Sequence, residues 1–155
     1  PTAPARAMPR TTAAYRTKPP ARGDRTAPFR VGGIIVGMGT FTHAIILISA
    51  DGLRREELNA QVDTGATFSS APAEVLERLG VRREDVVHLR LASGQIQERS
   101  LGFVRAQLMG VERFVPITFG EPGEPSVIGA VTLEIFLLAV GPVSQRLMPV
   151  VGLRL

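Results

Sequence analysis

The stretch Ala60-Gln61-Val62-Asp63-Thr64-Gly65-Ala66 decides how this chain is interpreted. Apolar and polar residues alternate before Asp63, which predicts a half-buried β-strand ending at that carboxylate. Gly65 suits a turn in which the backbone approaches its neighbour closely and its N–H bonds a carboxylate. Asp, Thr and Gly all favour turns, so an ordinary strand-ending turn is the alternative interpretation of this stretch.

A second short element, Val127-Ile128-Gly129, follows some sixty residues after Asp63. Two apolar residues followed by Gly form a segment that can pack beneath a tight turn, so we expect it to lie under the Asp63 turn. A plain core strand is the alternative interpretation, and it is compatible with the same packing. The two elements together are the only setting in which the sequence places a carboxylate for chemistry.

The rest of the body is predicted to be mainly β. Apolar alternation predicts strands over 41–48, 57–62, 87–91, 95–99, 104–108, 115–119 and 147–151. Turns are expected at Ser93-Gly94 and Met109-Gly110, and a loop at 121–125. One short helix is expected over 71–79, capped by Ser70 and stopped by Gly80, and a second over 130–138. Many short strands with two short helices predict a closed, barrel-like β fold.

Composition divides the chain in two. Residues 1–30 carry seven Arg and Lys against Asp24, a net +6, whereas the whole chain carries a formal +4. We expect residues 1–37 to be a disordered, basic extension rich in Pro, Ala and Arg, and 38–155 to be the folded domain, with Met38 a plausible start. The sequence pI of about 10.9 describes the extension, so no nucleic-acid partner is expected.

The sequence lacks the residues that several classes of functional site require. The chain has no Cys and only two His, so thiolate sites are excluded and no metal or other cofactor is expected. Residues 31–50 carry no formal charge, yet they are too polar and too broken by Gly for a good membrane span. A loop followed by a buried strand is the expected structure there. Lack of a signal peptide favours a cytoplasmic location.

The order of these motifs resembles a known group. Val62-Asp63-Thr64-Gly65-Ala66, then a helix, a Gly-tipped hairpin and Val127-Ile128-Gly129 before a second helix, resembles the retropepsin-like, single-domain aspartic peptidases. The resemblance covers about residues 38–151. The stretches 129–134 and 147–149 look especially like the prokaryotic members.

The resemblance implies a homodimeric endopeptidase acting on peptide or protein substrates. Asp63 of each copy would meet its mate at the two-fold axis, because peptide hydrolysis by this route needs two carboxylates that share one proton. Thr64 would join the two turns, and Gly65 and Ala66 would support them. Ala66 has no hydroxyl, so we expect a less acidic pH optimum than that of pepsin.

Further roles are implied for a hairpin and for the terminal strands. Ala92, Ser93, Gly94 and Gln95 would form a flap over the bound peptide, with Ala66, Val127 and Ile128 near the floor. An exposed β-turn is the alternative interpretation of that hairpin. Strands at about 38–48 and 147–155 would pair across the dimer and so protect exposed edges.

Some departures from the family pattern leave alternatives open. Ala130-Val131-Thr132 stands where retroviral members carry Arg and then Asp or Asn, and the flap has one Gly where theirs has several. A retropepsin-fold peptide-binding module with little or no turnover is therefore the second hypothesis. A nucleic-acid-associated protein using the basic extension is the third, and it requires steeply salt-dependent binding.

Overall fold

The computed structural model describes residues 30–31, 34–35 and 41–152. Contacts divide the chain into two units, residues 1–36 and 37–155. The described part of the first unit is a two-stranded antiparallel pair, β1 (Arg30–Val31) with β2 (Ile34–Ile35). Residues 1–37 were predicted to be a disordered extension, and apart from the β1–β2 pair they lie outside the described residues, as does the predicted start at Met38.

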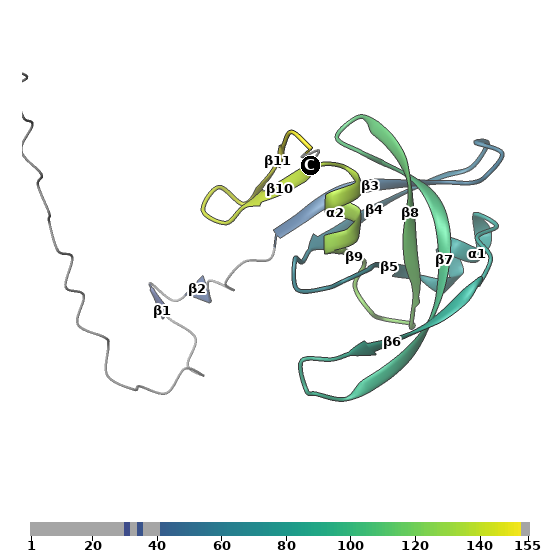
Figure 1. Cartoon of the computed structure of the whole chain (residues 1–155), viewed down its shortest axis with the longest axis horizontal. Helices are drawn as coiled ribbons and strands as arrows, with labels where there is room; N and C mark the ends of the chain where they lie inside the picture. The colour runs from purple at the N-terminus through teal and green to yellow at the C-terminus, as the bar shows by residue number, and fades with distance from the viewer. Residues whose placement is uncertain (1–29, 32–33, 36–40, 153–155) are drawn as a thin grey trace, which may run out of the picture. The chain divides into compact units, whose positions relative to one another are not determined.

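The second unit is built on one seven-stranded sheet in the order β3-β4-β9-β5-β8-β7-β6. Its strands are β3 (Phe41–Ile48), β4 (Arg55–Val62), β5 (Ser69–Pro72), β6 (Asp85–Arg90), β7 (Ile96–Leu108), β8 (Val111–Gly120) and β9 (Val127–Ile128). Because β3 also pairs with β7, the sheet curls into a nearly closed barrel (Figure 1). The predicted mainly β, barrel-like fold is confirmed.

Alternation along the strands explains why they form and where the core lies. On β4, Ala60 and Val62 are buried while their neighbours Asn59 and Gln61 face solvent. Alternate residues of the other long strands turn inward in the same way, since successive side chains of a strand point to opposite faces. The interior is filled by Ile45, Leu47, Ala60, Val62, Val104, Ala106, Leu108, Val115, Ile117 and Phe119, with Leu76 and Leu133 from the helices.

The first helix is shorter than expected. It runs over α1 (Ala73–Arg78), and Pro72, not Ser70, occupies the capping position without a side-chain hydrogen bond. The predicted Ser70 cap is wrong because Ser70 lies in β5, paired with Thr118 on one side and Val127 on the other. Gly80 ends the helix as predicted, with a positive φ of 75° that suits glycine.

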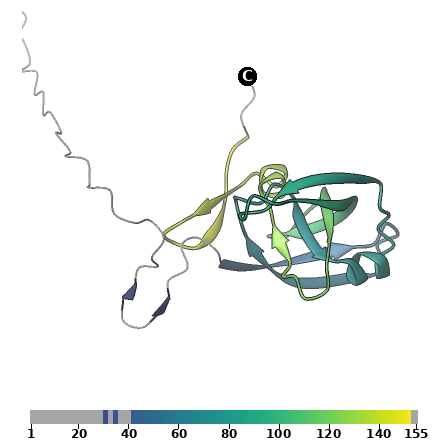
Figure 2. The ribbon, with the colours of Figure 1, turned by 90° about the horizontal axis from the view of Figure 1, so that it is seen from below.

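The second helix, α2 (Ala130–Ile135), ends before the predicted residue 138. Leu137 has a positive φ of 54°, and the next residue begins β10 (Leu138–Gly141), a strand that the sequence did not predict. It pairs with β11 (Arg146–Pro149), found where a last strand over 147–151 was expected. Figure 2 shows this separate two-stranded sheet extending away from the barrel. Because Leu138 pairs with Pro149 of β11, it cannot also continue α2.

The predicted strands 95–99 and 104–108 are one continuous strand, β7. It passes through Gly102, where a Cβ would collide with the carbonyl of Arg82 and lie 2.9 Å from Val81. Glycine therefore lets the strand run directly beneath the segment that follows α1. The prediction of two separate strands is wrong, because Gly102 permits one continuous strand.

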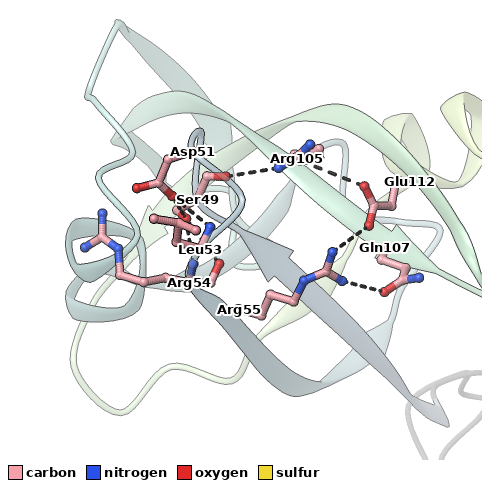
Figure 3. A network of polar contacts seen from close by, with 8 residues as sticks. All are labelled: Ser49, Asp51, Leu53, Arg54, Arg55, Arg105, Gln107 and Glu112. Carbon is pink, nitrogen blue, oxygen red and sulfur yellow. Dashed lines mark hydrogen bonds and ion pairs between the residues drawn. The ribbon is translucent and has the colours of Figure 1, made fainter.

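A polar network joins the β3–β4 turn to the β7–β8 hairpin (Figure 3). The buried Ser49 hydroxyl donates to Asp51 and accepts from the Arg54 N–H at 3.0 Å. The hydrogen bond from Ser49 holds the pKa of Asp51 below its usual value. Arg105 reaches the Ser49 carbonyl at 3.4 Å and lies 4.0 Å from Glu112, so strands distant in sequence are fixed to the same turn.

Candidate active site

Asp63 lies at the end of β4, directly beside the end of β9. The two strands run parallel, with Gln61 opposite Val127 and Val62 opposite Ile128. The Asp63 N–H donates to the Ile128 carbonyl at 3.0 Å, so the pairing continues into the turn. The structure therefore brings the two elements singled out in the sequence side by side, across more than sixty residues of chain.

The turn itself holds the carboxylate in a defined direction. The Gly65 N–H donates to Asp63 Oδ1 at 2.8 Å, and the Ala66 N–H donates to the Asp63 carbonyl at 3.2 Å. A Cβ on Gly65 would lie 3.1 Å from that same Oδ1, so glycine gives the carboxylate room. Asp63 is half-buried, while Thr64 and Gly65 are exposed. One half-buried carboxylate is thus held at a turn fixed by backbone hydrogen bonds.

Gly129 allows β9 and α2 to pack against the segment after the turn. A Cβ at Gly129 would lie 2.5 Å from the Phe68 carbonyl carbon and oxygen, and 2.9 Å from the Ala66 carbonyl oxygen. The N–H groups of Ala130 and Val131 then donate to Ala66 and Thr67, at 2.8 and 3.1 Å. The first N–H groups of α2 are therefore bonded by the segment that follows Asp63, which ties the two together.

A buried hydroxyl pair supports the same junction, and the sequence did not single it out. Ser69 Oγ accepts from the Gly129 N–H at 3.1 Å and lies 2.6 Å from Thr132 Oγ1. Both side chains are buried, and the Thr118 hydroxyl donates to the Ser69 carbonyl at 3.1 Å. Small polar residues at inward-facing positions were the available signal, but only the tertiary structure shows that they face one another.

The hairpin expected to act as a flap connects β6 to β7. Its turn is closed by hydrogen bonds from the Leu91 N–H to the Gln95 carbonyl and from the Gly94 N–H to the Leu91 carbonyl, each 2.8 Å. Gly94 has a φ of 86°, a conformation that glycine adopts without strain. Ala92, Ser93, Gly94 and Gln95 are all exposed at its tip.

A cavity of about 170 Å³ lies between this hairpin and the Asp63 turn. Ala66, Phe68 and Val127 line one side. Leu89, Leu91, Gln97 and Arg99 of the hairpin strands line the other, and Ser70, Thr118, Phe119, Gly120 and Glu124 complete the wall. Ile128, which was expected near the floor, is fully buried in the core instead. The cavity is mostly apolar, with a few polar groups in its wall.

Two further observations concern other kinds of site. Over residues 41–152 and the short β1–β2 pair, no three His, Asp or Glu come together to hold a metal ion. Within the same residues, no helix is both long and apolar enough to cross a membrane.

This chain is similar in structure to retropepsin-like aspartic proteases. A retropepsin-like aspartic protease from Rickettsia conorii shares 20% identity over 70% of this chain and 90% of its own, with a TM-score of 0.44. The protease of Simian Foamy Virus (mac) shares 14% identity over 61% and 92%, with the same score. The retroviral protease-like domain of Ddi1 from Leishmania major shares 14% over 70% and 87%, with a score of 0.42. No family model and no curated protein matches the sequence.

Proposed function

We propose that this chain is an aspartic endopeptidase whose active site forms when two copies bring their Asp63 carboxylates together. The observation that carries the proposal is the Asp63 turn, a strand-end carboxylate held by the Gly65 N–H at 2.8 Å beside an apolar cavity. Each chain supplies one such turn, and the chemistry needs two carboxylates. A two-fold axis at the turn supplies the second, and Thr64 is exposed where it can contact the partner copy.

The reaction follows from two carboxylates that hold one proton between them. The ionised Asp63 takes a proton from a water molecule, whose oxygen attacks the carbon of the peptide carbonyl. The protonated Asp63 of the other copy donates a hydrogen bond, and then its proton, to the carbonyl oxygen. The resulting gem-diol collapses as the C–N bond breaks: the now ionised Asp63 of the other copy takes back a hydroxyl proton, and the first Asp63 gives the proton it took from water to the departing nitrogen.

The substrate is an extended peptide bound between the hairpin and the turn. Leu89, Leu91 and Gln97 lie on the hairpin side of the cavity, while Ala66 and Val127 lie on the opposite side. A peptide in this space adds as a strand, with main-chain hydrogen bonds giving affinity and apolar side chains filling the cavity. Closure of residues 92–95 over it then excludes water from the reacting bond.

The test is cleavage of a mixed peptide library by the full chain, measured by mass spectrometry from acidic to neutral pH. Asp63→Asn is expected to remove cleavage, because the amide cannot act as the base. Asp85→Asn is the matched control, since Asp85 is an exposed carboxylate at the start of β6, and it is expected to cleave like the parent. Sedimentation of the parent is expected to show a dimer.

One alternative is favoured by a specific observation. The exposed hairpin tip carries a single glycine, Gly94, so its closure over a ligand is restricted and a peptide-binding module without turnover is the second candidate. Library peptides that bind the dimer but stay intact with both parent and Asp63→Asn would establish the binding module and exclude the peptidase.

A further inference from the structure

Arg99 is a nearly buried cation close to the base of the hairpin. It lies on β7 opposite Val87 of β6, and its side chain is only 10% exposed. The guanidinium contacts two carboxylates, with one nitrogen 2.8 Å from Glu121 and another bonded to Glu124. By comparison, the Arg78 side chain is 55% exposed and makes a single ion pair, with Glu56. Arg99 is therefore held by a two-carboxylate clamp, in which both ends of its fork are used.

The two carboxylates belong to a loop that is itself rigidly built. The Glu124 N–H donates to the Glu121 carbonyl at 3.1 Å, and the Glu121 N–H donates to Glu124 Oε2 at 2.9 Å. Gly123 completes the turn with a φ of 85°. The loop leads directly into β9, which pairs with the strand that ends at Asp63. Arg99 thus connects the hairpin to the part of the chain that supports the Asp63 turn.

The clamp also lies at the edge of the cavity proposed to hold the peptide, which is called the groove below. Arg99 and Glu124 line the cavity of about 170 Å³ beneath the hairpin, together with Leu89. Arg99 and Glu121 line a neighbouring cavity of about 270 Å³. The same guanidinium therefore borders both spaces, and its two ion pairs fix the separation between the hairpin base and the loop.

We infer that Arg99 is a positioning residue for substrate binding, which sets the width of the groove by joining the hairpin to the 121–124 loop. The inference rests on the proposed function. Glu121 and Glu124 are 61% and 42% exposed and regain water when the pairs break, whereas the guanidinium has no comparable alternative. Loss of the clamp removes the ion pairs between the hairpin and the loop and leaves the β6–β7 ladder and the continuation of β7 along β8. Because Arg99 acts through the hairpin rather than on the reacting atoms, the effect falls on substrate binding.

The experiment compares Arg99→Met, Arg99→Lys and the double variant Glu121→Gln/Glu124→Gln, with Arg78→Met as the control at an exposed pair. Relative to the parent chain, Arg99→Met is expected to raise KM about tenfold and to change kcat less than about twofold. Arg99→Lys keeps the charge but not the planar fork, so an intermediate KM is expected. The double variant leaves the guanidinium without a carboxylate, so it should raise KM at least as much as Arg99→Met, whereas Arg78→Met should match the parent.

A second measurement needs no substrate. Hydrogen exchange of the backbone amides of residues 86–99 in the ligand-free chain is expected to be about fivefold or more faster in Arg99→Met, while β3 and β4 amides keep their rates. Unchanged exchange in 86–99, equal acceleration in β3 and β4, or a KM within about twofold of the parent would each overturn the inference. If exchange in Arg99→Met is faster only in residues 86–99 but the parent cleaves no peptide, the result supports the positioning role of Arg99 and rejects the proposed peptidase function.

Discussion

Gly129→Ala tests whether close packing between α2 and the segment after Asp63 holds the Asp63 turn in place. The added methyl carbon would lie 2.5 Å from two backbone atoms of Phe68 and 2.9 Å from the Ala66 carbonyl oxygen. Ordinary contacts between such atoms need about 3.5 Å, so the two segments must separate by roughly 1 Å. Because backbone atoms are involved, no side-chain rotation relieves the overlap.

The expected loss of stability follows from two contributions. Overpacking of this kind costs about 1–3 kcal/mol. Separation also lengthens the hydrogen bonds from Ala130 to Ala66 and from Val131 to Thr67, each worth about 1 kcal/mol. If both hydrogen bonds are lost, the free energy of unfolding should fall by about 3–5 kcal/mol, which is a large part of the 5–15 kcal/mol typical of a domain.

The assay is urea unfolding of the full chain, followed by circular dichroism. Gly123→Ala is the matched control, because Gly123 has a φ of 85° but no atom within 4 Å of an added Cβ. It should lose only the cost of a left-handed alanine, about 1–2 kcal/mol. A loss in Gly129→Ala no larger than that in Gly123→Ala would refute the packing argument. Cleavage activity should fall in Gly129→Ala even under conditions where it remains folded.

Other consequences of the structure can be checked in the same way. Ser69→Ala leaves the buried Gly129 N–H and Thr132 hydroxyl without their partner, so the free energy of unfolding in urea should fall by about 1–3 kcal/mol. A lowered pKa means that Asp51 contributes stability at neutral pH that is lost as the pH falls below its usual 3.8, so Asp51→Asn should flatten the decline of the urea midpoint in that range. An optimum well below about pH 4 in the parent pH–rate profile would contradict the role given to Ala66, and Ala66→Ser, which adds a hydroxyl beside the carboxylate, should move the optimum toward more acidic pH.

Local patterns predicted the features that depend on nearby residues. The strand before Asp63 was predictable because Ala60 and Val62 alternate with polar residues over one element, and the turn because Gly65 follows directly. The breaks at Gly80 and Gly110 were likewise visible, since positive φ at a helix or hairpin end is a local requirement. The mainly β fold followed from the number of such short strands.

Features set by competition between distant segments were not predictable locally. Serine favours the capping position of a helix, yet Ser70 lies in a strand because it pairs with both β8 and β9. Leu138 continues an apolar helical pattern, yet pairing with β11 ends α2 before it. In each case hydrogen bonds to another part of the chain outweigh a propensity of a few tenths of a kcal/mol.

The sequence by itself determined that one carboxylate, Asp63, ends a strand at a Thr-Gly turn, because alternation and turn chemistry act over neighbouring residues. Only the tertiary structure placed β9 beside that strand, put the Ser69–Thr132 pair beneath it and brought Arg99 to the 121–124 loop. Those contacts join residues twenty to seventy positions apart. Their partners are chosen by packing and by the need to satisfy buried polar groups, which no local pattern encodes.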